Sequence, residues 1–147
     1  MIAIRRCKKD DFDQVYLLLR QLWEKQTLPQ AVLQSVYDRG LDSHLQNYIC
    51  ASTEADKIVG FCSLSLKNNL WQGGYLAHID ELIVDAEHRG RGVGGRLLDA
   101  IIEIAAARGC PRVELDSAFH RAEAHEFYGG RGFEKRAYRF SKRCGPQ

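Results

Sequence analysis

The stretch HRGRGVGG, residues 88–95, holds the groups of this chain that are best suited to bind an anion. Glycines let the main chain turn tightly, so that consecutive amide groups converge on a negatively charged ligand. A helical pattern begins at Val93 and adds the unpaired amides and positive dipole end of a helix. Positive charge comes from Arg89, Arg91 and Arg96. An ordinary turn would gain nothing from four glycines so close together, and the stretch therefore predicts a phosphate-binding loop.

One reading of this loop is the dinucleotide fingerprint G-x-G-x-x-G, formed by Gly90, Gly92 and Gly95. Glu114 or Asp116 follows about 20 residues later, where a ribose-binding acid belongs. Two features argue against it. In that fold the first glycine follows its strand almost directly, whereas residues 85–89 intervene here, and too little chain remains to complete a doubly wound sheet. Binding of a nicotinamide dinucleotide is thus the less favoured alternative.

The remaining pattern predicts a single mixed α/β domain over residues 1–147. The expected order is strand 1–7, helix from Asp10, helix from Pro29 to about Arg39 stopped by Gly40, strands 48–53, 58–66 and 76–84, helix from Val93 to a cap at Gly109, strand 112–116, helix 121–131 and strand 134–141. We expect a mostly antiparallel central sheet with helices on both faces.

Composition excludes several classes of protein. A net charge of +2 is too small for a nucleic-acid-binding surface, and no apolar stretch is long enough for a signal peptide or a membrane span. The five scattered cysteines contain no C-x-x-C pair, which argues against zinc and disulfides and favours a reducing, cytoplasmic setting. The histidines show no metal-binding spacing, so no metal is expected.

Two runs resemble the signatures of one family, the Gcn5-related N-acetyltransferases (GNAT). V-D-x-x-x-R-G-x-G-x-G-x-x-L-L begins at Val84, and A-x-x-F-Y-x-x-x-G-F begins at Ala124. The resemblance covers the chain from about Tyr48 to the end, and ELIV, RAEAHEFY and YRFSK are similar to the aminoalkylphosphonate N-acetyltransferase branch. It implies the GNAT fold and an enzyme that uses acetyl-CoA to acetylate a small-molecule amine.

The resemblance also implies how acetyl-CoA is bound. The pyrophosphate is expected on the loop amides, and the pantetheine arm is expected to pair with the main chain of the preceding strand as an added strand would. The residues implied are Leu82, Ile83, Val84, Arg89, Gly90, Arg91, Gly92, Val93, Gly94, Gly95 and Arg96, of which the last two close the loop.

Glu81 is the candidate base, because a carboxylate inside an apolar strand is costly unless it is paired or used. A primary amine with a pKa of about 10 must lose a proton before it attacks a thioester, often through water. Alternation predicts that the neighbouring Asp80 points to the opposite face, so only one of the two can face a given cleft. Asp80 is the reserve candidate and His78 the third. A salt-bridged or solvent-facing Glu81 remains the structural alternative.

The resemblance also implies that Tyr128 protonates the departing thiolate. The structural alternative is that Tyr128 is a core aromatic residue whose hydroxyl is simply hydrogen-bonded. Two positions depart from the family. Arg121 stands where asparagine is usual, and it could face an anion or solvent. Gly129 and Gly130 follow the tyrosine, which predicts that this helix ends early or frays.

The acceptor amine is not specified by these motifs. Trp71 and Tyr75, in the segment NNLWQGGY, could line an acceptor pocket or cap the core. Aminoalkylphosphonates, polyamines, aminoglycosides, amino acids and protein amines all fit. A non-catalytic sensor that binds acyl-CoA through the same loop is the functional alternative, and a homodimer is compatible with the family.

Overall fold

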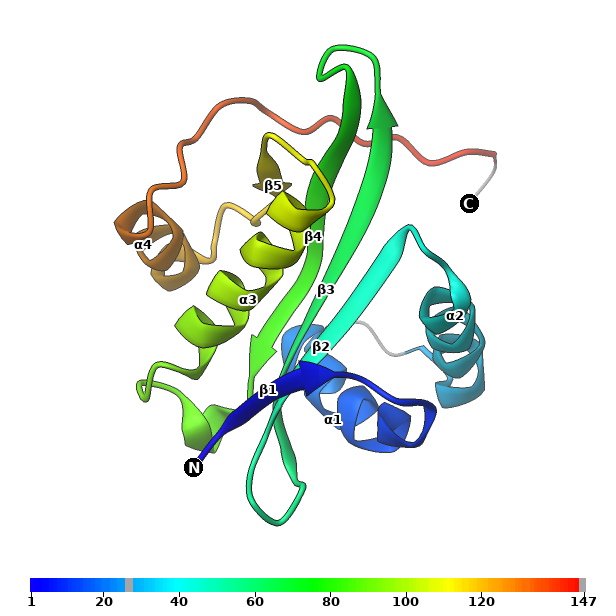
Figure 1. The fold of residues 1–147 in the computed structure, drawn as a ribbon, viewed down its shortest axis with the longest axis vertical. Coiled ribbons are helices and arrows are strands. Elements are labelled where there is room, and N and C mark those ends of the chain that lie inside the picture. Colours follow the sequence, from blue (N-terminus) through cyan, green and yellow to red (C-terminus); the bar gives the residue numbers. More distant parts are fainter. Residues whose placement is uncertain (26–27, 146–147) are drawn as a thin grey trace. The chain divides into compact units, whose positions relative to one another are not determined.

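The computed structural model describes residues 1–25 and 28–145. The chain divides into two compact units, Met1–Glu114 and Leu115–Gln147. Its elements run in the order β1 (Ala3–Arg6), α1 (Phe12–Leu22), α2 (Gln30–Asp42), β2 (Gln46–Ser52), β3 (Ile58–Asn69), β4 (Gly74–Val84), α3 (Val93–Ala107), β5 (Val113–Leu115) and α4 (Ala122–Gly130) (Figure 1). Among the described residues, no helix has both the length and the apolar composition that spanning a bilayer requires.

The strands form one sheet in the order β1-β2-β3-β4-β5. The pairs β1–β2, β2–β3 and β3–β4 are all antiparallel. The longest ladder joins β3 to β4 and extends to Asn69 and Gly74, next to the hairpin turn. The predicted mixed α/β fold with a mostly antiparallel sheet is confirmed.

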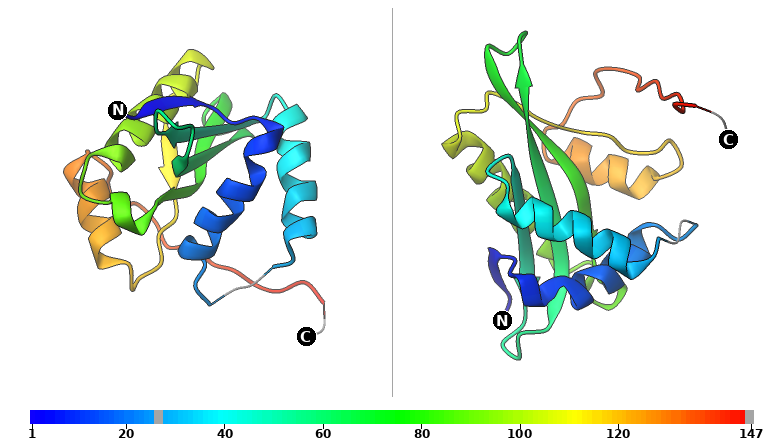
Figure 2. Two further views of the ribbon diagram at one scale, coloured as in Figure 1. Left: turned by 90° about the horizontal axis from the view of Figure 1, so that it is seen from below. Right: turned by 90° about the vertical axis from the view of Figure 1, so that its right-hand side faces the viewer.

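Helices of the first unit cover both faces of this sheet (Figure 2). Cys50 and Phe61 belong to the core cluster that includes α1 and α2. Ala51 and Gly60, the next residues along the two strands, face the other way toward α3, where a methyl group on Gly60 would come within 2.8 Å of Leu97. The buried residues of α3 form the predicted apolar stripe: Val93, Gly95, Leu97, Leu98, Ile101 and Ala105. The sheet is thus the centre of the first unit, with helices packed on both of its faces.

The second helix continues past the glycine that was expected to stop it. α2 includes Gly40 and ends only at Asp42, so the sequence-based boundary is wrong. A methyl group at Gly40 would lie 2.0 Å from the Tyr48 hydroxyl oxygen. Only glycine fits at position 40, because the Tyr48 ring of β2 packs directly against the helix. No local sequence pattern reveals this tertiary contact.

The end of α3 follows the prediction. Gly109 has a φ of 80°, the left-handed conformation that glycine adopts without strain. The amide of Cys110 donates to the Ala105 carbonyl oxygen at 3.0 Å and closes the last turn. Here the signal is local, and the boundary is confirmed.

The second unit differs from the sequence prediction at two places. α4 includes Gly129 and Gly130 rather than ending before them, and Gly132, at a φ of 88°, follows it. The Phe133 amide donates to the Tyr128 carbonyl oxygen at 3.1 Å, which closes the helix end. No strand is present among the described residues 134–145. Alternating residue types are insufficient there, because a strand also requires a hydrogen-bonded neighbour.

Candidate active site

A β-bulge interrupts the pairing of β3 with β4 beside the predicted base. Ser63 pairs with Glu81, but the next residue, Leu64, pairs with Ile79. Asp80 is therefore an extra residue on β4. A bulge of this kind bends the strand and re-aims the side chains next to it.

The bulge brings both carboxylates to one face of the sheet. The Ser63 hydroxyl donates to Glu81 Oε1 at 2.5 Å, and the Ser65 hydroxyl donates to Asp80 Oδ2. Because Ser63 and Ser65 are alternate residues of β3, they share a face, and so do the carboxylates bonded to them. The prediction that Asp80 and Glu81 point to opposite faces is wrong, because strict alternation fails at the inserted residue.

Ser63 also fixes the orientation of Glu81. Its hydroxyl oxygen accepts the Glu81 backbone N–H at 3.0 Å while its proton goes to the Glu81 carboxylate. Ser63 is only 1% exposed, so its hydroxyl is satisfied by Glu81 rather than by solvent. Next to this pair, His78 Nδ1 lies 2.8 Å from Asp80 Oδ1. The three residues named as candidate bases therefore belong to one polar cluster.

Burial tunes the Glu81 carboxyl group. Loss of solvent raises the pKa of Glu81, an effect that the Ser63 hydrogen bond partly offsets, and the negative charge of Asp80 raises it further. Tyr48, which pairs with Ser63 across β2 and β3, also has a raised pKa because of burial and the charges of Glu81 and Asp80. A carboxyl group with a raised pKa is a stronger base than an exposed one, as proton abstraction near neutral pH requires.

The glycine loop has the backbone geometry of an anion site. Gly90 and Gly92 have φ values of 77° and 81°, and Gly92 is the N-cap of α3. The Arg96 amide donates to the Gly92 carbonyl oxygen at 3.1 Å as the helix begins. Amides in the first turn precede any possible intrahelical acceptor, so those of residues 93–95 remain available for a phosphate. The residues present therefore fit a pyrophosphate group.

The strand end and the first helix hold the loop in place. Asp85 accepts a hydrogen bond from the Gln21 side-chain amide at 2.8 Å, and its other oxygen lies 2.9 Å from His88 Nδ1. The Arg89 Nε donates to the Val84 carbonyl oxygen at 3.1 Å. Arg96 donates to the Ile2 carbonyl oxygen at 2.7 Å, so its guanidinium ties α3 to the N-terminal segment. The role of Arg96 in closing the cofactor loop stays a prediction.

The end of β4 joins Glu81, the predicted base, to the glycine loop. Leu82, Ile83 and Val84 pair with Cys62, Phe61 and Gly60 of β3. The Ile83 side chain is buried in the core cluster, whereas Leu82 and Val84 are half-buried. On the β5 side of β4, the Ala77 amide donates to the Arg112 carbonyl oxygen at 3.3 Å. Backbone pairing of residues 82–84 with a pantetheine arm stays a prediction.

The predicted acceptor residues lie far from this cluster. Trp71 is 92% exposed in the β3–β4 hairpin turn, so it does not cap the core. Tyr75 pairs with Asn68 and lies, by alternation through Ala77 and Ile79, on the face opposite Glu81. Six residues of strand separate Tyr75 from Glu81, a span of about 20 Å. The structure therefore does not bring Trp71 and Tyr75 together with the carboxylates.

Tyr128 and Arg121 lie in the second unit. The Tyr128 ring centroid is 5.5 Å from that of Phe127 and 5.7 Å from that of Phe133, so the phenol packs in an aromatic cluster of its own unit. Arg121 is the N-cap residue of α4 and is partly exposed. The role of each residue remains a prediction from the signature.

A second buried group, of two cysteines and a carboxylate, adjoins Tyr48, because the Cys7 amide donates to the Tyr48 carbonyl oxygen at 2.9 Å. Cys7, Asp11 and Cys50 bring potential metal ligands within 4.8 Å of one another. Both Asp11 oxygens accept from Arg5, at 2.8 and 3.0 Å, and Asp11 Oδ2 also accepts the Lys8 amide. A hydrogen bond to Cys50, together with burial, raises the pKa of the Cys7 thiol. An ion pair and a thiol hydrogen bond thus account for these residues.

Sequence reasoning missed Ser63, Ser65 and Tyr48 as parts of the polar cluster. The signal for the serines was present: the run FCSLSL places two hydroxyls at alternate positions of an otherwise apolar strand. Tyr48 offered no such signal, because its place beside Ser63 depends on the register of β2 against β3.

Several known proteins that are similar to this chain are acetyltransferases. The acetyltransferase (GNAT) family matches residues 12–133. The chain is 30% identical to the aminoalkylphosphonate N-acetyltransferase of Salmonella typhimurium, over 95% of this chain and 89% of that protein. It is 27% identical to the glucosamine 6-phosphate N-acetyltransferase of Trypanosoma brucei brucei, over 91% and 92% of the two chains.

The fold agrees with that of solved structures. The aminoglycoside N-acetyltransferase AAC(6')-Iy in complex with CoA superposes with a TM-score of 0.85 at 21% identity, covering 98% of this chain and 96% of that one. The family match spans most of the chain, and the similarity to the Salmonella enzyme is nearly full length. The protein is therefore an enzyme of the GNAT family of acetyltransferases.

Proposed function

We propose that this enzyme moves the acetyl group of acetyl-CoA to a primary amine of a small molecule by direct attack, with Glu81 as base and Tyr128 as acid. Membership of the family supports the reaction class. Relatives named for aminoalkylphosphonate and glucosamine 6-phosphate support a small acceptor, and a fold neighbour crystallised with CoA supports the co-substrate. The five free cysteines agree with a reducing, cytoplasmic setting.

The observation that carries the proposal is the half-buried Glu81 carboxylate, which accepts a hydrogen bond from the Ser63 hydroxyl. Acetyl-CoA supplies an activated thioester carbonyl. As the amine nitrogen bonds to that carbon and the carbon–sulfur bond breaks, Glu81 takes the surplus amine proton, directly or through one water. Its raised pKa makes it a more effective proton acceptor than an exposed carboxylate.

The glycine loop is assigned to the pyrophosphate and the end of β4 to the pantetheine arm. Gly90 and Gly92 give the backbone the curvature that directs amides toward a phosphate, and the N-terminus of α3 adds its dipole. Arg89 and Arg91 add positive charge beside these amides. The main chain of Leu82, Ile83 and Val84 would bind the arm as a neighbouring strand is bound.

Tyr128 is assigned the proton that goes to the departing thiolate, on the strength of the second signature. A thiol pKa of about 8.5 makes that leaving group tolerable, so we expect Tyr128→Phe to lower kcat by about 10²-fold, the lower end for acid catalysis. Coenzyme A affinity should change little. Tyr138→Phe is the matched control, since this exposed tyrosine lies in the same unit. Equal kcat in the Tyr128 variant and the wild type would remove the acid role.

An acetylation screen over aminoalkylphosphonates, sugar phosphate amines, polyamines, aminoglycosides and amino acids, followed by thiol release, tests the proposed reaction. We expect turnover that depends on acetyl-CoA. Coenzyme A binding without turnover of any amine would instead support a non-catalytic sensor. A thermal shift with NAD and none with coenzyme A would favour the dinucleotide reading of the loop.

A further inference from the structure

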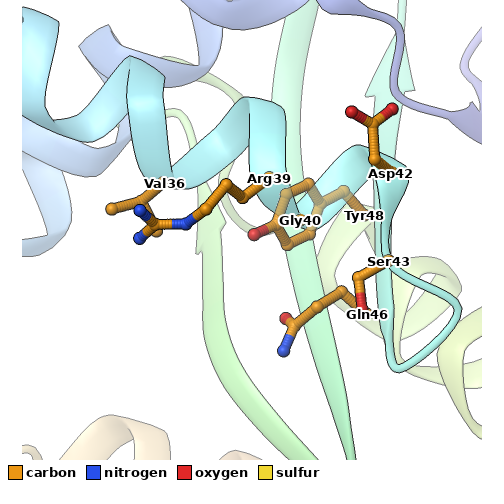
Figure 3. Close-up of a pocket in the computed structure, with 7 residues that line it drawn as sticks. All are labelled: Val36, Arg39, Gly40, Asp42, Ser43, Gln46 and Tyr48. Atoms are coloured by element: carbon orange, nitrogen blue, oxygen red, sulfur yellow. The ribbon is translucent and has the colours of Figure 1, made fainter.

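An open cavity of about 620 Å³ lies between the end of α2 and the start of β2 (Figure 3). Its lining includes Arg39, Ser43, Gln46 and Tyr48. These residues provide a guanidinium, two hydroxyls and a side-chain amide, all of which donate hydrogen bonds. None of them belongs to the family signatures at the glycine loop or at Tyr128.

Hydrogen bonds connect this cavity to the carboxylates of β4. The Ser65 hydroxyl lies 3.4 Å from Gln46 Oε1 in the cavity wall, and the same hydroxyl bonds Asp80. Tyr48 lies on the Glu81 face, because it pairs with Ser63 and Ser63 pairs with Glu81. Two strand spacings, about 10 Å, separate the Tyr48 and Glu81 backbones.

The cavity has a positive charge, Arg39, on one side and the two carboxylates of β4 on the other. Burial raises the pKa of Tyr48 most, the charges of Glu81 and Asp80 raise it further, and Arg39 lowers it, so the hydroxyl lies within the field of these three charged groups. Within the described residues, no carboxylate forms an ion pair with Arg39. Asp42 also lines the cavity, but its carboxylate is directed away from the Gln46 amide (Figure 3).

The cavity wall offers hydrogen-bond donors besides the Arg39 guanidinium. Ser43 Oγ accepts the Leu45 amide at 3.1 Å, which leaves its hydroxyl proton to donate elsewhere. Gln46 lines the cavity with a side-chain amide that lies 3.4 Å from Ser65 Oγ. The Arg39 guanidinium can address two oxygens of a tetrahedral anion, and the Ser43 hydroxyl adds a further donor in the cavity wall.

We propose that this cavity binds the acceptor, with its primary amine toward Glu81 and Asp80 and a phosphonate or phosphate monoester group on Arg39. This deepens the proposed function and rests on it. A small molecule with an amine at one end and a dianionic group at the other is complementary to the carboxylates on β4 and to the Arg39 guanidinium. A polycationic acceptor would place a second ammonium against Arg39, which is unfavourable. Arg39 is then a specificity-determining residue that contacts the substrate.

The test compares 2-aminoethylphosphonate with 1,3-diaminopropane in the wild type, in Arg39→Gln and in Arg108→Gln. Arg108 is a matched control, an exposed helix-end arginine on α3. We expect Arg39→Gln to lower kcat/KM for 2-aminoethylphosphonate by about 10- to 100-fold, mainly through KM, because a charge-assisted hydrogen bond is lost. The value for the diamine should be unchanged or higher, and Arg108→Gln should resemble the wild type.

Calorimetric titration with 2-aminoethylphosphonate in the presence of coenzyme A separates this proposal from the proposed function. Binding by the wild type that is lost in Arg39→Gln supports the cavity even if no acetyl group is transferred. Turnover of other amines, with no binding of the phosphonate or with equal binding by both proteins, overturns the cavity assignment and leaves the acetyltransferase proposal standing.

Discussion

The glycine loop and the β-bulge are separated by only a few residues of chain, yet they are built in opposite ways. The loop presents backbone amides, and its shape comes from glycines at positive φ and from the start of α3. The bulge presents side chains, and their direction depends on which residues of β3 lie opposite. One site is encoded locally, whereas the other is encoded by pairing between distant segments.

This difference determines what a mutation can remove. At the loop, no single side chain carries the interaction, so a substitution acts by distorting the main chain. At the bulge, one carboxylate and one hydroxyl carry it, and an isosteric change can remove the chemistry without altering the fold. The comparison is sharpened by substitutions that leave one kind of site intact while they damage the other.

Glu81→Gln should have the largest effect on activity. Glutamine retains the size of the side chain and can still accept from the Ser63 hydroxyl, but it cannot take a proton. We expect kcat to fall by about 10²- to 10⁴-fold, with coenzyme A affinity unchanged, as measured by steady-state kinetics and by calorimetry. Asp80→Asn is the comparison variant and should lose less, because Glu81 is the proposed base and Asp80 contributes negative charge beside it. A larger loss of kcat in Asp80→Asn than in Glu81→Gln would identify Asp80 as the base in place of Glu81.

The same variant should be more stable than the wild type. Because the folded state raises the pKa of Glu81, this carboxyl group favours folding at low pH, and that contribution is lost as the pH rises through the folded-state pKa. Glutamine never carries the charge. The gain in Tm for Glu81→Gln should therefore be larger at pH 8 than at pH 5. An equal Tm difference at both pH values would contradict a raised pKa.

Gly92→Ala should damage the loop through its backbone. A φ of 81° costs an alanine about 1–2 kcal/mol, so we expect roughly a 5- to 30-fold loss of coenzyme A affinity if the loop relaxes to avoid the strain. Gly73→Ala is the matched control, since Gly73 has a φ of 70° in the hairpin turn. It should lose similar stability in denaturant titrations and retain its affinity for coenzyme A. If both variants lost the same affinity for coenzyme A, the glycine loop would not be the site that binds it.

How much the sequence reveals follows the same division. The α3 stripe, its cap at Gly109 and the glycine loop were predictable because each depends on neighbours within a few residues. Three features were not. Gly40 continues its helix while Tyr48 packs on it, the Asp80 insertion exists only relative to β3, and residues 134–141, predicted as a strand, form none. Each of these features depends on a contact with a distant segment of the chain, and the periodicity of residue types does not encode such contacts.

Ser63→Ala should have the smallest effect on the maximal rate, and it tests whether the pairing partner tunes the base. The Ser63 hydrogen bond lowers the pKa of Glu81, so its removal should raise that pKa further. A base works only when deprotonated, and the acidic limb of the kcat/KM profile should therefore move to higher pH. We expect a several-fold loss near neutral pH and recovery in more alkaline buffer.

Ser65→Ala is the matched control for this shift, because its hydroxyl bonds Asp80 rather than Glu81. Ser63→Ala should also lower the free energy of unfolding by about 1–3 kcal/mol, since the Glu81 backbone N–H loses its buried acceptor. A pH profile that moves in Ser63→Ala and not in Ser65→Ala would assign the tuning to one hydroxyl on the facing strand. Identical profiles in both variants would mean that burial alone sets the basicity of Glu81, and the bulge would then serve only to orient it.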